Sequence, residues 1–125
     1  MVDTRRLRDV LVDRFPDLVA GVSLPGTNRL RVLVRDGSIV DVWFSLWFED
    51  RYSYHWERRA IDGTLYRCDN APHERWASVK TFPHHFHDGS EEGVVESFVP
   101  AEPEAGLVRF MEFVQERLKA KDPHP

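Results

Sequence analysis

The chain has 125 residues, of which 42% are hydrophobic and 30% are charged, and its formal net charge is −4. This size and composition are typical of a globular protein that buries a core without disulfide bonds, so we expect a single domain over residues 1–125. The only cysteine, Cys68, excludes an intramolecular disulfide and favours a reducing compartment. The net acidity argues against tight non-specific binding to nucleic acid, but it leaves room for a local basic face.

Neither the N-terminal residues nor the most apolar segment of the sequence predicts contact with a membrane. Residues 1–13 mix charged and apolar side chains, so they do not form the apolar region of a signal peptide. The most apolar run, residues 39–48, contains Asp41 and Ser45 and is too short to cross a bilayer. We therefore expect a cytoplasmic protein without membrane contact.

The first expected element is a helix that Asp3 or Thr4 caps and that Pro16 ends. Its apolar residues recur at helical spacing, at Leu7, Val10, Leu11 and Phe15. Residues 17–28 contain two glycines and a proline, so we expect an irregular segment with at most a short strand.

From Arg29 onward the apolar period changes to two, which predicts a strand that a hairpin turn at Asp36-Gly37 ends. The next strand, residues 38–49, has apolar residues on both faces and is expected near the centre of a sheet. A third strand is expected over residues 52–60. A turn at Asp62-Gly63 then leads into a fourth strand over residues 64–70.

If two residues form the turn at Asp62-Gly63, the pairing of the third and fourth strands follows from it. His55 would lie opposite Asn70, and Arg58 would lie opposite Arg67. Like charges directly across a ladder are unfavourable. The arginine pair therefore indicates either a bound anion or two long side chains that diverge into water.

The remaining segments predict a loop or helical turn over residues 71–80 and an extended segment over 81–87, where Pro83 favours a sheet edge. A final strand is expected over residues 94–99. The closing helix follows Pro103, with one apolar stripe formed by Leu107, Phe110, Met111, Val114 and Leu118. The expected fold class is α+β: one antiparallel sheet of four to six strands with the N- and C-terminal helices packed on it.

Residues 51–87 hold most of the side chains that can do chemistry, including five of the six histidines. Their six basic and four acidic residues give this segment a charge of +2 inside an acidic chain. Histidines suit general acid–base catalysis because their ordinary pKa lies near neutral pH. The candidate catalytic residues are His55, His73, His85 and His87.

Two other interpretations of the histidines stay open. Imidazole and carboxylate groups are also zinc ligands, so His73, His85, His87 and Asp69 form an alternative metal site. The histidines could instead be surface and packing residues at a sheet edge. We otherwise expect no cofactor, because the chain has no glycine-rich phosphate loop, no Gly-x-Ser-x-Gly elbow and no Cys-x-x-Cys pair.

Candidate substrate-binding residues lie in the same segment. Arg58 and Arg67 could hold phosphate, and Tyr54 or Trp56 could stack on an unpaired base. The Asp69–His73 turn, stiffened by Pro72, would hold Asn70 and His73 at fixed places. The same aromatic row is also consistent with half-buried sheet packing.

Three motifs in this segment resemble the TumE-like family of prokaryotic toxin–antitoxin modules. They are Tyr-Ser-Tyr-His at 52–55, Asp-Asn-Ala-Pro-His at 69–73 and Phe-Pro-His-His-Phe-His at 82–87. The resemblance covers residues 51–99 and implies a toxin whose partner is a DNA-binding antitoxin protein.

We combine the resemblance and the histidines in one hypothesis: a metal-independent ribonuclease whose substrate is RNA. The alternatives are a non-enzymatic module that docks a partner protein and a histidine metal-binding protein.

Overall fold

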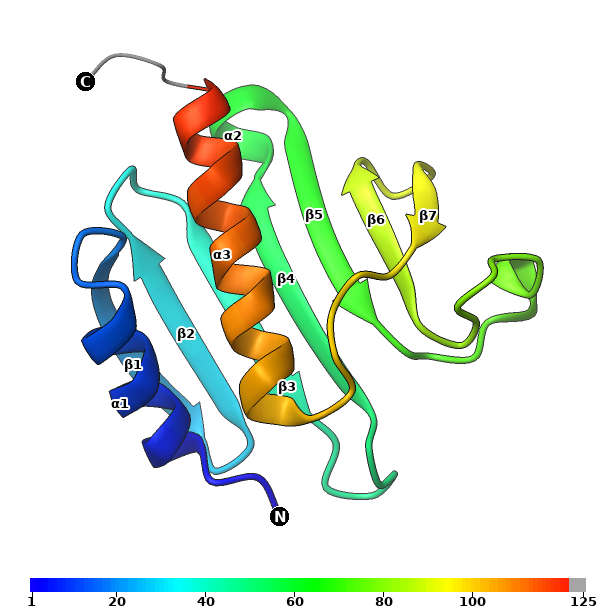
Figure 1. Ribbon diagram of the computed structural model, residues 1–125, viewed down its shortest axis with the longest axis horizontal. Helices are drawn as coiled ribbons and strands as arrows, with labels where there is room; N and C mark the ends of the chain where they lie inside the picture. The colour runs from blue at the N-terminus through cyan, green and yellow to red at the C-terminus, as the bar shows by residue number, and fades with distance from the viewer. Residues whose placement is uncertain (122–125) are drawn as a thin grey trace.

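A computed structural model describes residues 1–121 of the chain. Its centre is one seven-stranded antiparallel sheet in which the strands follow one another in chain order, from β1 to β7. Helices α1 (Thr4–Arg14) and α3 (Pro103–Lys121) pack on the same face of this sheet (Figure 1). The expected α+β class and the packing of both terminal helices are confirmed, with seven strands in place of four to six.

The strand bounds are β1 (Val19–Gly26), β2 (Arg29–Val34), β3 (Ile39–Phe44), β4 (Tyr52–Arg58), β5 (Thr64–Asp69), β6 (His85–Gly89) and β7 (Val94–Glu96). Two short helical turns interrupt the meander, α2 (Arg59–Asp62) and the 3₁₀ turn η1 (Glu74–Trp76). The added first strand forms where an irregular segment was expected. As an edge strand, β1 tolerates Pro25 and the register shifts on both sides of Gly21–Ser23.

The first helix begins and ends where the sequence predicts. The Asp3 side chain accepts hydrogen bonds from the backbone N–H groups of Arg5 and Arg6, and the helix ends before Pro16. Leu7 and Leu11 on this helix are buried against the sheet.

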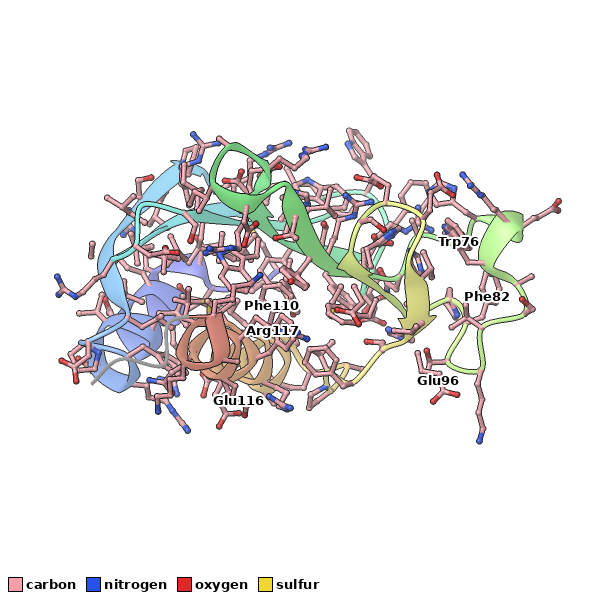
Figure 2. All side chains as sticks on the ribbon, turned by 90° about the horizontal axis from the view of Figure 1, so that it is seen from above. Trp76, Phe82, Glu96, Phe110, Glu116 and Arg117 are labelled. Carbon is pink, nitrogen blue, oxygen red and sulfur yellow. The ribbon has the colours of Figure 1, made fainter. Side chains whose placement is uncertain are left out.

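The core lies between the sheet and the two helices. Alternate residues of β2, β3 and β4 are buried on this side, as the period-two pattern predicts. Phe110 of α3 packs on Tyr54 of β4, with ring centroids 5.8 Å apart. Figure 2, seen from above, shows both helices on one side of the curved sheet, with Phe110 between α3 and the strands.

The predicted pairing of β4 and β5 is wrong. His55 lies opposite Arg67 and Arg58 lies opposite Thr64, a shift of three residues from the expected register. The cause is the connection: residues 59–62 form a helical turn, which Gly63 closes at φ 80°. Because an odd shift exchanges the two faces of a strand, Arg58 and Arg67 point to opposite sides of the sheet.

Strand β3 is shorter than the strand expected over residues 38–49. Strand β3 ends at Phe44, and the Ser45 side chain accepts hydrogen bonds from the backbone N–H groups of Trp47 and Phe48. These bonds replace ladder bonds, so residues 45–51 form a loop. Within residues 1–121, no helix combines the length and apolarity needed to cross a membrane.

Candidate functional site

The face of the sheet that the helices leave uncovered carries two cross-strand rows of polar side chains. In one row, His55 of β4, Arg67 of β5 and His87 of β6 lie directly opposite one another. In the next row, Ser53 and Asp69 lie opposite each other, and Asp69 faces His85. Side chains two residues apart share a face of a strand, so both rows point into the same space.

Arg67 is the centre of this arrangement. Its Nη1 lies 3.3 Å from His55 Nδ1, and its Nη2 lies 3.4 Å from His87 Nε2. Its Nε donates to Asp69 Oδ2 at 3.2 Å, and Glu91 receives hydrogen bonds from both terminal nitrogens at 3.1 and 2.7 Å. This two-pronged contact is the geometry in which a guanidinium binds a carboxylate or a phosphate.

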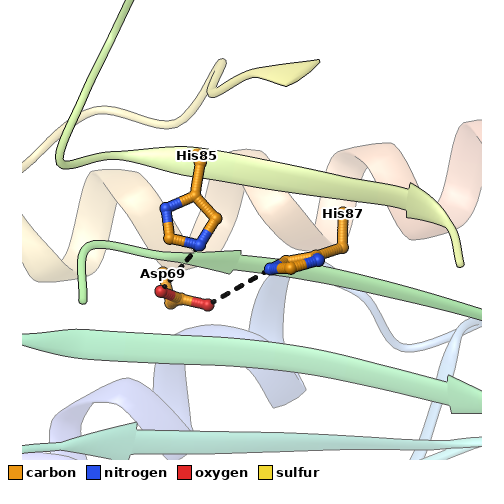
Figure 3. Close-up of side chains that lie close together, drawn as sticks. All are labelled: Asp69, His85 and His87. Carbon is orange, nitrogen blue, oxygen red and sulfur yellow. Dashed lines mark ion pairs between the residues drawn. The ribbon is translucent and has the colours of Figure 1, made fainter. Parts of the chain in front are cut away.

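Asp69 and His85 form a buried pair (Figure 3). Asp69 Oδ1 accepts a hydrogen bond from the Ala71 backbone N–H and lies 3.1 Å from His85 Nε2. Burial alone would raise the pKa of Asp69, but its contacts with His85 and Arg67 lower that pKa. Burial alone would lower the pKa of His85, but the Asp69 carboxylate and the Pro83 carbonyl raise it.

His87 has the opposite electrostatic environment. Its Nδ1 donates to the Glu91 backbone carbonyl at 2.8 Å, and its Nε2 lies 3.8 Å from Asp69 Oδ2. Burial and the neighbouring Arg67 guanidinium lower the pKa of His87, because both disfavour a second positive charge. This environment favours the neutral form of the ring, and the Nδ1–H bond to the Glu91 carbonyl puts its lone pair on Nε2.

The same histidines could hold a metal ion. One ligand atom each from Asp69, His85 and His87 lies within 4.8 Å of the other two. Both rings donate from Nδ1 to a backbone carbonyl, which leaves Nε2 facing the carboxylate, the usual arrangement around a bound metal. Among the described residues, His85 Nε2 is also a buried nitrogen without a well-formed hydrogen bond. The Arg67 guanidinium beside His87 opposes a cation at this place.

A cleft of about 480 Å³ opens above the two rows except at His55, which adjoins Arg67 but does not line it, and we call it the histidine cleft. Its lining includes Arg67, Asp69, His85 and His87 from the sheet, Glu91 and Glu92 from the β6–β7 loop, and Trp43, His73, Arg75 and Trp76 around its rim. The Trp76 ring stands at 90° to the His87 ring, with centroids 6.0 Å apart. Figure 2 labels Trp76 beside β6, at the end of the sheet where the 3₁₀ turn lies.

A comparison with protein families assigns the chain. The family model described as Toxin TumE matches residues 5–118. The chain belongs to the TumE toxin family. The resemblance carried by the three motifs is confirmed, and the match extends well beyond them to both terminal helices. No curated protein and no solved structure was found to be similar to the chain.

Membership of the TumE family implies a toxin of a toxin–antitoxin system and a cognate antitoxin, without specifying the activity. In this TumE-family toxin, four of the residues singled out in the sequence come together: His55, Arg67, His85 and His87. Asp69, named for the metal alternative, joins them. His73 lies exposed at the rim and is not part of the metal-ligand group.

The other candidates lie elsewhere in this TumE-family toxin. Tyr54 and Trp56 are 1% and 0% exposed in the core, where no substrate base can reach them. Arg58 is buried on the helix side with Asp36 and Asp62. Asn70 accepts a hydrogen bond from the Tyr52 backbone N–H and donates to the Asp50 carbonyl, so it ties two loops together.

Sequence reasoning missed several residues of the cleft, among them Glu91, Trp43 and Trp76. Glu91 lies in a turn after β6, and Trp43 and Trp76 carry no motif of their own. Only a correct β4–β5–β6 register would have indicated that Glu91 and Trp76 approach Arg67 and His87.

Proposed function

We propose that this TumE-family toxin cleaves RNA without a metal ion, with its active site in the histidine cleft and at the adjoining His55. The observation that carries the proposal is the cross-strand row in which Arg67 lies within 3.4 Å of a histidine on each side. Cleavage of RNA through the ribose 2′-OH needs a base, an acid and a cation that stabilises the charge of the phosphorane. The row supplies all three kinds of group.

In this mechanism His87 is the base. Its Nδ1 donates to the Glu91 carbonyl, so the lone pair is on Nε2, where it accepts from Arg67 Nη2 at 3.4 Å until a phosphate binds the guanidinium. A 2′-OH next to a phosphate on Arg67 would place its proton near His87 Nε2. His55 is the acid on the other side, with Glu57 3.0 Å from its Nε2 holding the ring so that Nδ1 faces the guanidinium. In its protonated form His55 would give the Nδ1 proton to the 5′ oxygen, which leaves as its bond to phosphorus breaks and the 2′ oxygen bonds to phosphorus.

The Glu91 carboxylate marks the place of the substrate phosphate. It occupies both terminal nitrogens of Arg67, the seat that two oxygens of a phosphodiester would take. The Glu91 side chain is 48% exposed and belongs to the loop between β6 and β7, so it can leave Arg67 without disturbing the sheet. When the substrate binds, its phosphate then replaces the Glu91 carboxylate on Arg67.

Asp69 and His85 are positioning residues in this proposal. Both nitrogens of His85 face other groups, Pro83 and Asp69, and its side chain is 1% exposed. Asp69 in turn receives the Nε–H of Arg67 and fixes the plane of the guanidinium. Trp43 and Trp76 at the rim replace Tyr54 and Trp56 as surfaces on which an unpaired base could stack.

The test is RNA cleavage by purified, antitoxin-free protein with and without EDTA. We expect cleavage in both conditions, and a loss of about 10²- to 10⁴-fold in His87→Ala and His55→Ala. The matched control is His84→Ala, because His84 contacts the Tyr52 hydroxyl and does not contact Arg67. Intact RNA after prolonged incubation, or equal rates in all three variants, would refute the proposal.

A metal-binding function is the second candidate, because His85 Nε2 is buried, lacks a well-formed hydrogen bond and faces Asp69. Zinc would suit the two imidazoles and the carboxylate. The test is elemental analysis of freshly purified protein and calorimetric titration with Zn²⁺, with His85→Ala as the variant and His84→Ala as the control. Stoichiometric zinc that only His85→Ala loses, together with cleavage that EDTA abolishes, would favour this candidate over the metal-independent one.

A further inference from the structure

A cluster of exposed apolar side chains lies outside the core, in the loop between β3 and β4. Leu46, Trp47 and Phe48 are 54%, 91% and 58% exposed. Neighbouring apolar side chains that are left in water are unfavourable, and such patches usually mark an interaction site. Tryptophan is strongly enriched among the hot-spot residues of protein interfaces. Trp47 is almost fully exposed and is therefore a candidate for such a residue.

The loop holds these side chains in a defined conformation. The Ser45 hydroxyl accepts the backbone N–H groups of Trp47 and Phe48 at 3.1 and 2.9 Å. The Arg51 guanidinium lies over the Phe48 ring, 4.4 Å from its centroid. Asn70 donates to the Asp50 carbonyl at 2.7 Å and anchors the loop to the end of β5. The loop is therefore already ordered before a partner binds, which reduces the conformational entropy lost on binding.

A groove of about 690 Å³ lies beside this loop, and we call it the loop–helix groove. The start of α1, the start of α3 and the loop itself surround it. Its apolar lining includes Val2, Leu7, Phe44, Leu46, Trp47 and Pro103. A groove of this kind takes the apolar face of a short helix or extended segment.

The charges around the loop–helix groove are mostly negative. Five carboxylates line it, from Asp3, Glu49, Asp50, Glu102 and Glu104, against two guanidinium groups. One of the guanidinium groups, that of Arg6, is already paired with Glu104 at 2.7 Å. The side chains of the rim therefore have a net charge of −3, which favours a partner with lysine or arginine beside its apolar residues.

We propose that the loop–helix groove binds a basic amphipathic segment of the cognate antitoxin. Its apolar side chains fill the groove against Trp47, and its cations face the carboxylates of the rim. The inference rests on membership of the TumE toxin family for the identity of the partner, but it does not depend on RNA cleavage. Arg51 and Tyr52 line both the groove and the histidine cleft, so a protein seated here also reaches the edge of the proposed active site.

The charge distribution opposes two other occupants. A second copy of the chain in a two-fold dimer would bring one acidic rim against the other. An anionic lipid surface would be repelled by the same carboxylates. A basic segment of a different protein would be repelled in neither way.

The test is calorimetric titration of the purified antitoxin encoded beside the toxin gene into the full-length toxin, using the His87→Ala variant as background so that the protein can be produced. We expect Trp47→Ala to weaken binding by about 30-fold or more, as the loss of an interface tryptophan does. Glu49→Lys should weaken it too, more strongly at low salt. The matched control is Ile61→Ala, which truncates another exposed apolar residue, 50% exposed on α2 and outside the groove.

A second measurement separates this proposal from the proposed function. Trp47→Ala without the background substitution should cleave RNA at the wild-type rate while escaping inhibition by the antitoxin. Unchanged antitoxin affinity in both Trp47→Ala and Glu49→Lys would overturn the inference. So would a Trp47-dependent dimer in light scattering, or Trp47-dependent binding to vesicles of anionic phospholipid.

Discussion

Arg67 and His55 lie directly opposite each other on neighbouring strands, with Nη1 and Nδ1 3.3 Å apart. His87 continues the same row on the far side of Arg67. A side chain in the middle of a row has both neighbours fixed by the hydrogen bonds of the sheet, which gives the precise placement that a reacting group requires.

Arg67→Lys should abolish most RNA cleavage. A lysine has one ammonium group and cannot make the two parallel contacts that Arg67 makes with Glu91, so it should not replace arginine on a phosphate. We expect kcat/KM to fall by about 10²- to 10³-fold. The control is Arg31→Lys on β2, which removes a two-pronged contact with Asp41 on the exposed surface. Equal losses of activity in both variants would indicate that the substitutions act by destabilising the fold and not by removing a phosphate contact in the cleft.

Glu91→Gln should strengthen the binding of oxyanions to the cleft. The substitution removes the negative charge that competes with a phosphate for Arg67, so we expect inorganic phosphate to inhibit RNA cleavage at several-fold lower concentration. The control is Glu92→Gln, which breaks the exposed pair between Glu92 and Arg75 one residue further along. An unchanged inhibition constant would show that Glu91 does not occupy the phosphate position.

Asp69→Asn should destabilise the fold. It leaves the buried His85 without a charged partner and removes one of the two carboxylates that contact Arg67, which costs about 3 kcal/mol in the free energy of unfolding. Asp41→Asn on the exposed surface is the matched control and should cost less than about 1 kcal/mol. Urea denaturation of both variants measures the difference. Equal stabilities would mean that the Asp69–His85 pair contributes nothing to the fold.

The stability should also depend on pH through Arg58, which is buried on the opposite side of the sheet. Its guanidinium contacts the carboxylates of Asp36 and Asp62. Burial alone would raise the pKa of both carboxyl groups, but hydrogen bonds from Ser38 to Asp36 and from Thr64 to Asp62, with the contacts of Arg58, lower them below 3.8.

A carboxyl group whose pKa is lowered by folding stabilises the folded state above its ordinary pKa and loses that contribution as the pH falls. We therefore expect the free energy of unfolding to decrease as the pH falls through and below about 3.8. In Asp36→Asn this decrease should be smaller, because one of the two groups no longer titrates. Asp9→Asn on the exposed side of α1 is the control. Urea denaturation between neutral pH and pH 3 measures both slopes, and parallel slopes in wild type and Asp36→Asn would contradict the prediction.

The first helix and strand β2 could be predicted because their sequence signals lie within the elements themselves or next to their ends. Asp3 and Pro16 mark the limits of the first helix, and the period of two from Arg29 to Val34 matches the buried face of β2. The loop at residues 45–51 escaped prediction because its apolar side chains imitate a continuing strand. Burial had to be known before Trp47 could be read as a surface residue.

The sequence by itself determined the fold class, the family and the segment that carries the histidines, since periodicity, capping residues and motifs are properties of neighbouring positions. Only the tertiary structure decided which of those residues meet. A helical turn at residues 59–62, closed by Gly63, moves β5 by three residues against β4 and places Arg67, in the position expected for Asn70, beside His55. Register depends on the backbone geometry of one connection, and a single change there reassigns every side chain on the face.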